Sequence, residues 1–126
     1  MKSFIVAILV AVFLIGGSVG YGIYIDNVTD NIQGCMDEIE SIIKSGDYRE
    51  AKDKLSDFSD MLEKENTLLG SITEHKEIFE IKRNIFEIDV FLDEENREES
   101  LSRLHAIKSV SEQMSGNTKL KIRNIL

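Results

Sequence analysis

The stretch from Phe4 to Ile25 reads FIVAILVAVFLIGGSVGYGIYI and contains no charged side chain. An α-helix rises about 1.5 Å per residue, so this stretch is long enough to cross a hydrocarbon core of roughly 30 Å. Lys2 precedes it, and Asp26 and Asp30 follow it. Because cytoplasmic flanks are enriched in Lys and Arg, the sequence predicts a single-pass cell-membrane protein with a cytoplasmic N-terminus and an extracytoplasmic C-terminal domain.

A cleaved secretory signal peptide is the alternative interpretation of the same stretch. Its apolar core would be residues 4–15, and Ser18-Val19-Gly20 would supply the small residues of a cleavage site. The apolar run resumes from Tyr21 to Ile25, and a cleaved protein would have little use for that segment. We therefore favour an uncleaved signal-anchor over a protein that is secreted after cleavage.

Gly16 and Gly20 form a G-x-x-x-G pair within this stretch. Such spacing allows two membrane helices to approach closely, so the pair is a candidate for helix packing in a homodimer. The simpler interpretation is that the glycines mark the end of a signal core.

The composition limits the remaining choices. The chain has 126 residues, 15 Lys and Arg against 23 Asp and Glu, a formal charge of −8, one cysteine and no proline. The acidic balance argues against nucleic acid as a partner, because that surface requires clustered cations. One cysteine excludes an internal disulfide framework. The absence of proline favours long, uninterrupted helices.

Apolar residues recur at helical spacing in four further segments. These run from Val28 to Ile43, from Ala51 to Leu69, from Ile78 to Leu92 and from Leu101 to Val110. Short connections between them predict antiparallel neighbours. The expected fold is all-α, with an N-terminal transmembrane helix followed by an antiparallel bundle of about four helices in two hairpins.

Turn signals separate these segments. Ser45-Gly46 can end the first helix and Asp47 can cap the second. Gly70 is the expected break before a capping box at Ser71 to Glu74. A single glycine costs a helix only about 1 kcal/mol, so fusion of the second and third segments through Gly70 is the alternative.

The predicted domains are a signal-anchor at 1–26, a helical bundle at 27–117, which Gly116-Asn117 would end, and a basic tail at 118–126. In the tail, Lys119, Lys121 and Arg123 alternate with apolar residues, which is strand-like spacing. A terminus that folds back on the bundle is the favoured interpretation. The functional alternative is a docking tail for an acidic partner or for anionic lipid head groups.

The chain also aligns with itself at an offset of 49 residues. Core residues pair at this offset, and Gly46-Asp47 falls on Glu95-Asn96. The core pairs are Ile32 with Ile81, Met36 with Ile85, Ile39 with Ile88, Ile43 with Leu92, Leu55 with Leu104 and Phe58 with Ile107. A duplicated hairpin would explain the alignment, but 49 is seven heptads, so unrelated heptad helices would align as well.

No catalytic constellation is recognisable, and we predict no enzymatic activity, cofactor or metal site. Antiparallel pairing about Glu95 would separate His75 from His105 by about 15 Å, which excludes a shared metal. Cys35 is expected to be a buried, inert thiol, and the alternative is an intermolecular disulfide that links a dimer. The acidic cluster at 93–99 lacks the pattern of a calcium loop.

Taken in order along the chain, several features resemble a known family. They are the short N-terminal apolar segment, the acidic helical body, Glu74-His75 before a long helix and the terminal Asn124-Ile125-Leu126. This order is similar to the small clostridial, membrane-anchored proteins of the domain of unknown function 4363. The resemblance implies a bacterial membrane protein without an assigned activity, so it transfers no functional residue.

The sequence therefore predicts a membrane-anchored, extracytoplasmic helical protein. Its partners would be membrane lipid, through the N-terminal helix, and another membrane or envelope protein. A ligand-sensing or regulatory bundle that acts through a membrane partner is the alternative function.

Overall fold

The computed structural model describes the backbone of residues 2–69 and 75–125, and their side chains except those of 65–69, 75, 117–122 and 124–125. Four helices account for most of these residues: α1 (Lys2–Ser45), α2 (Tyr48–Leu69), α3 (His75–Asp93) and α4 (Arg97–Ile125). The described ranges contain no strand, which confirms the all-α prediction.

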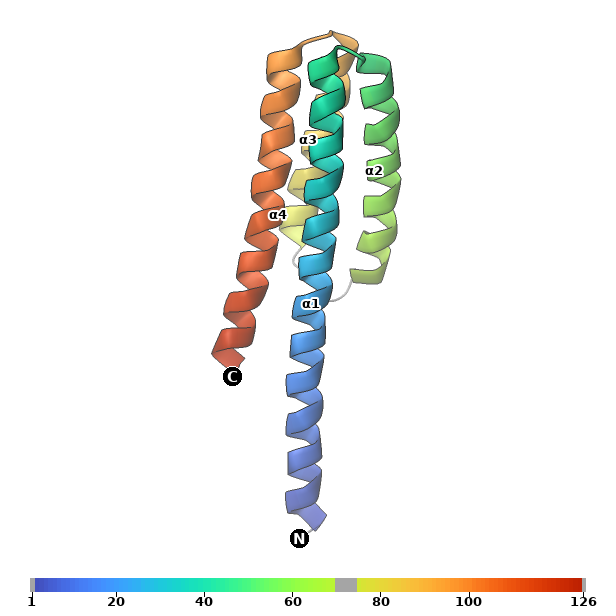
Figure 1. Ribbon diagram of the computed structural model, residues 1–126. Helices are drawn as coiled ribbons and strands as arrows, with labels where there is room; N and C mark the ends of the chain where they lie inside the picture. The colour runs from blue at the N-terminus through green and yellow to red at the C-terminus, as the bar shows by residue number, and fades with distance from the viewer. Residues whose placement is uncertain (1, 70–74, 126) are drawn as a thin grey trace.

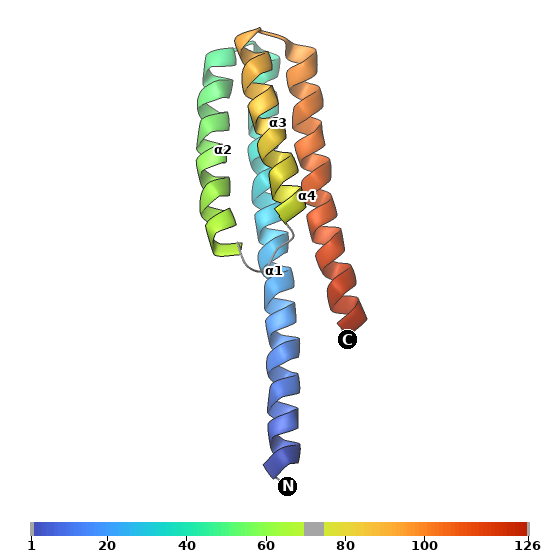
Figure 2. The same ribbon diagram turned by 180° about the vertical axis from the view of Figure 1, so that it is seen from behind.

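The first helix is continuous from the apolar stretch into the bundle (Figures 1 and 2). Its N-terminal turns extend alone below the other helices, and its second half contributes one quarter of the bundle. No break occurs at Asp26, where the sequence alone suggested a domain boundary, and no proline interrupts the helix there. The predicted anchor and the first bundle helix are thus one element.

The bundle is an antiparallel arrangement of two hairpins, as predicted. Each helix packs against two others, so that α1 and α3 lie on one diagonal and α2 and α4 on the other. α2 ends at Leu69 and α3 begins at His75 in the opposite direction, so the fused alternative is wrong. Gly70 and the capping box at 71–74 lie outside the described residues.

One hydrophobic core fills the space between the four helices. Its members come from the predicted apolar faces, with additions at the lower ends of α1 and α4. The buried apolar side chains are Ile25, Val28, Ile32, Met36, Ile39, Ile43, Ala51, Leu55, Phe58, Leu62, Ile78, Ile81, Ile85, Ile88, Leu92, Leu104, Ile107, Val110 and Met114.

The two hairpin turns have the same geometry. Gly46 ends α1 with φ of 86°, and Glu95 ends α3 with φ of 54°. In both turns this residue donates its N–H to the carbonyl three residues back, and the next residue donates to the carbonyl five residues back. Asp47 and Asn96 then cap the following helix, since each carboxylate or amide oxygen accepts the N–H three residues on, at 3.1 and 3.2 Å.

These equivalent turns lie at the predicted offset of 49 residues, and so do two ion pairs. Lys54 pairs with Glu38 at 3.3 Å, and Arg103 pairs with Glu87 at 3.1 Å. Both members of every predicted core pair are buried. Heptad spacing accounts for the core pairs, but it does not require the same left-handed turn or the same interhelical ion pair. The structure therefore favours a duplicated hairpin.

The C-terminal segment differs from the strand-like expectation, because α4 continues through Gly116 to Ile125. One exposed glycine costs a helix about 1 kcal/mol and does not terminate it without a capping partner. Basic residues near the end of a helix also interact favourably with its dipole.

Candidate functional site

Polar side chains join α1 and α4 at the lower end of the bundle. The Thr29 hydroxyl donates to the carbonyl of Ser111 at 3.3 Å. The Gln33 amide donates to the carbonyl of Lys108 at 2.9 Å and to the Ser111 hydroxyl at 2.7 Å. Ser115 donates to the Asp26 carboxylate one turn lower. Because these groups satisfy one another, they fix the register of α1 against α4.

Above these contacts, charged side chains of the same two helices form a compact cluster. The Lys108 ammonium pairs with Asp37 and, at 3.2 Å, with Glu40. Glu40 also lies 3.4 Å from Lys44 and 3.4 Å from His105 Nε2. The hydrogen bond from Lys108 holds the pKa of Glu40 below its usual value, and the hydrogen bond to Asp37 raises the pKa of Lys108. The cluster pairs opposite charges across α1 and α4 and so joins the two helices.

A groove of about 340 Å³ lies between α2 and α3. Leu55, Ile85 and Phe86 form its apolar part, and Lys52 and Lys82 line its polar part. The side chain of Phe86 is 69% exposed, although it belongs to a bundle with a full core. Small-molecule sites in helical bundles lie between helices and combine apolar walls with a few polar groups, and this groove has that composition.

The outer face of α3 continues this apolar surface. Phe79 and Phe86 are seven residues apart and Val90 follows, so the three residues lie along one face of the helix. Phe79 is 71% exposed. We call these three residues the α3 apolar stripe. Exposed aromatic side chains are enriched at protein interfaces, and the stripe is therefore a candidate contact surface.

A second, smaller groove of about 200 Å³ lies between α1 and α2, and Cys35 lines it together with Phe58 and Met61. Burial, and then the charge of Glu38, raise the pKa of the Cys35 thiol. The cysteine is free and partly buried in the single chain. A thiol with a raised pKa is a poor nucleophile, which favours the inert interpretation, and the intermolecular disulfide stays a prediction.

The other predicted site residues are the two membrane-segment glycines and the basic tail. Gly16 and Gly20 are exposed on the free half of α1, and a Cβ at either position would contact nothing within 4 Å. Lys119, Lys121 and Arg123 lie on the last turns of α4, where Arg123 is exposed. The helix-packing role of the glycines and the docking role of the tail are therefore still predictions.

Within the described part of the chain, no group of three or more His, Cys, Asp or Glu residues is arranged to hold a metal ion. His105 is on the surface of α4 beside Glu40. His75 is the first residue of α3, and its side chain is not among those described.

Sequence reasoning missed two of these features. The α1–α4 contacts involve Thr29, Gln33 and Ser111, which lie on or beside the inward faces of their helices. Their polar side chains do not mark these positions as core. The spacing could have indicated Ser111, because it follows Ile107 by four residues and therefore lies on the same helix face. The α2–α3 groove left no signal, since its width depends on the packing of two helices at once.

These observations define a class of protein: a small all-α chain in which one exposed apolar helix continues into an antiparallel four-helix bundle. The family comparison agrees with the resemblance seen in the sequence. Residues 21–125 match the domain of unknown function (DUF4363), so the chain belongs to this family. No curated protein and no solved structure matches the chain.

Proposed function

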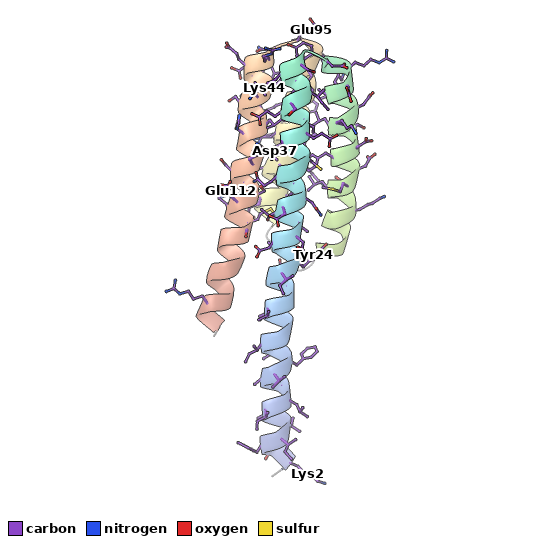
Figure 3. The ribbon with its side chains drawn as sticks, viewed as in Figure 1. Lys2, Tyr24, Asp37, Lys44, Glu95 and Glu112 are labelled. Carbon is purple, nitrogen blue, oxygen red and sulfur yellow. The ribbon has the colours of Figure 1, made fainter. Side chains whose placement is uncertain are left out.

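We propose that this protein is a single-pass membrane protein that binds another membrane or envelope protein through its helical bundle. The carrying observation is the free half of α1, whose most apolar window has a mean hydropathy of 2.5 and no buried residue. Figure 3 draws these side chains from Lys2, at the free end, to Tyr24, where the bundle begins. Covering one large apolar side chain contributes about 1.5–3 kcal/mol, so a bilayer around this segment would be strongly favourable.

The orientation follows from the flanking charges. Lys2 lies at the free end of α1, and the acidic bundle begins after Ile25. The positive-inside tendency would keep Lys2 in the cytoplasm and export the bundle. A bundle that is released by cleavage near Gly20 is the competing outcome, and it would leave a secreted protein.

The contact surface that we assign to the partner is the α3 apolar stripe with the adjoining α2–α3 groove. Replacing Phe79 and Phe86 by serine should abolish partner binding and leave the fold intact, because both side chains are exposed. The test is chemical cross-linking in native membranes, followed by purification of the full chain. The matched control replaces Glu112 and Gln113, which are exposed on α4, by serine. The proposal is wrong if both double variants retain, or both lose, the same cross-linked partner.

The α2–α3 groove also supports a second function, in which the bundle senses a small ligand and signals through a membrane partner. Its volume of about 340 Å³ is near the lower end of the range for ligand pockets. The test screens amphiphilic small molecules against the detergent-solubilised full chain. A molecule that binds in the groove should raise the Tm of the chain in a dose-dependent manner. Substituting Ser59 by leucine, which would fill part of the groove, should remove that shift. We propose no enzymatic role.

A further inference from the structure

The last turns of α4 extend below the rest of the bundle and run beside the free half of α1 (Figures 1 and 2). The hydrogen bond between Ser115 and Asp26 shows that these two residues lie at the same height along the bundle axis. Arg123 lies eight residues further along α4, and Ser18 lies eight residues back along α1. Since both helices rise about 1.5 Å per residue, the end of α4 is level with the region of Ser18 on α1.

Burial along α1 agrees with this register. Ser18, Tyr21 and Gly22 are partly buried, whereas the described residues from Lys2 to Gly17 are all exposed. α4 is the described helix that reaches this level. The part of α1 that is fully exposed, from Lys2 to Gly17, is therefore about 24 Å long, which is shorter than a hydrocarbon core of roughly 30 Å. The bilayer has to thin around this short span, and the stretch from Ser18 to Ile25 then falls at the outer interface. Tyr21 and Tyr24 are residues typical of that interface.

The charged residues that α1 and α4 bring to this level all have one sign. From Gln113 to the end of the chain there are three cations and no Asp or Glu, and α1 has no charged side chain between Phe4 and Ile25. Lys119, Lys121 and Arg123 thus lie at the depth where the phosphates of the outer leaflet are found. Each basic residue near the surface increases the affinity of a segment for an anionic bilayer by about fivefold.

We propose that the C-terminal turns of α4, with Lys119, Lys121 and Arg123, bind the anionic phospholipid headgroups of the membrane that holds α1. This inference rests on the proposed membrane anchoring. It assigns lipid rather than an acidic protein because the register brings the tail to the headgroup layer itself. Headgroup binding holds the lower end of α4 against the bilayer and so fixes the tilt of the bundle.

The test reconstitutes the full chain into vesicles of phosphatidylcholine alone and into vesicles with about one third phosphatidylglycerol. Hydrogen exchange of residues 116–125 is followed in each. We expect exchange in the anionic vesicles to be at least tenfold slower, because each of the three cations multiplies the attraction by about fivefold. Raising the salt to about 0.5 M should abolish most of the difference, since screening shortens the range of the attraction.

The tail variant replaces Lys119, Lys121 and Arg123 by glutamine, and it should exchange equally fast in both vesicles. The control variant replaces Lys44, Arg49 and Arg97 by glutamine, which removes the same charge at the opposite end of the bundle, and it should behave as the native chain does. Equal exchange of the native tail in both vesicles overturns the inference, as does an equal effect of the two variants. Stabilisation of the helix dipole alone would give such a lipid-independent result. Failure of the chain to remain in neutral vesicles after alkaline extraction would instead refute the anchoring itself.

Discussion

Gly46 and Glu95 occupy equivalent positions in the two hairpin turns, and both have positive φ. Only glycine adopts this conformation without a steric cost from Cβ, which for other residues is about 1 kcal/mol. Nothing lies within 4 Å of a Cβ placed on Gly46, so a substitution there changes the backbone energy alone. The first turn thus has the favourable residue, and the second carries strain.

Exchanging these residues should therefore shift stability in opposite directions. Gly46→Ala should lower the free energy of unfolding by about 1 kcal/mol, and Glu95→Gly should raise it by about 0.5 kcal/mol. Urea denaturation of the full chain in detergent, followed by circular dichroism, measures both. Gly34→Ala is the control, because Gly34 is an exposed helical residue with open space around it. Alanine at this position should stabilise α1 and so raise the free energy of unfolding. If Gly46→Ala stabilises the chain as Gly34→Ala does, the left-handed turn is not the native one.

A second prediction at this scale concerns pH. Lys108 lowers the pKa of Glu40, so this carboxyl group binds a proton less readily in the native state than in the unfolded chain. The resulting stability is present above the unfolded pKa of about 4.5 and is lost as the pH falls through the lowered native value. For Lys108 the pKa is raised, so its contribution is present below the ordinary lysine pKa and is lost at higher pH.

Glu40→Gln should accordingly cost about 1 kcal/mol at pH 7 and progressively less as the pH falls through the lowered native pKa of Glu40. Denaturation midpoints of native and variant chains from pH 3 to pH 8 give the comparison. Glu112→Gln, at an exposed position on α4, is the control and should change little. A cost that is the same at pH 3 and pH 7 would show that Glu40 acts through packing rather than through its charge.

At the scale of the helices, α2 and α4 are equivalent in the duplicated hairpins but differ in how closely they pack. α4 contacts both of its neighbours extensively, whereas α2 is bordered by the two grooves. Side-chain size explains the difference. α2 buries Phe58 and Leu62 where α4, at the offset of 49, buries Ile107 and Ser111. The larger residues hold α2 further from α1 and α3, and the small Ser111 lets α4 approach α1 closely enough for hydrogen bonds.

α2 should therefore open locally more often than α4. Hydrogen exchange of amides in 51–62 is expected to be about tenfold faster than that of 100–111, because local opening exposes fewer apolar contacts. The measurement uses the full chain in detergent at neutral pH. Ser111→Leu should reduce the difference by forcing α4 away from α1, and similar protection of both segments in the native chain would contradict the argument.

For the whole molecule, spacing along the sequence was sufficient for the bundle and its turns. Apolar residues at helical intervals mark the core, and Gly46-Asp47 marks the first turn, because each of these choices is local. The helical end of α4 was not predictable, since its last turns alternate like a strand and α1 lies beside them only in the folded chain. The α2–α3 groove likewise depends on the sizes of side chains from two helices that are distant in sequence.

The duplicated hairpin also explains where the anchor is placed. At the offset of 49, the residues of α1 before Tyr21 fall on α2 and not on α3. They therefore have no counterpart in the second hairpin, and most of this extra part is apolar and exposed. Because α1 is one rigid helix, the orientation of the bundle and that of the anchor cannot be set independently.

This coupling allows the topology to be tested with one cysteine in the bundle half of α1 and one near its free end. Cys35 lies within the bundle, where burial raises the pKa of its thiol, so it should react with a membrane-impermeant maleimide on intact cells only after addition of urea. In a Cys35→Ser chain, Ser3→Cys should react only after the cells are permeabilised. The reverse pattern would show that the bundle faces the cytoplasm. If cleavage occurs near Gly20, Cys35 will be labelled in the medium and a cysteine at position 3 will be absent from the mature chain, so the anchored and the secreted forms are distinguished in the same experiment.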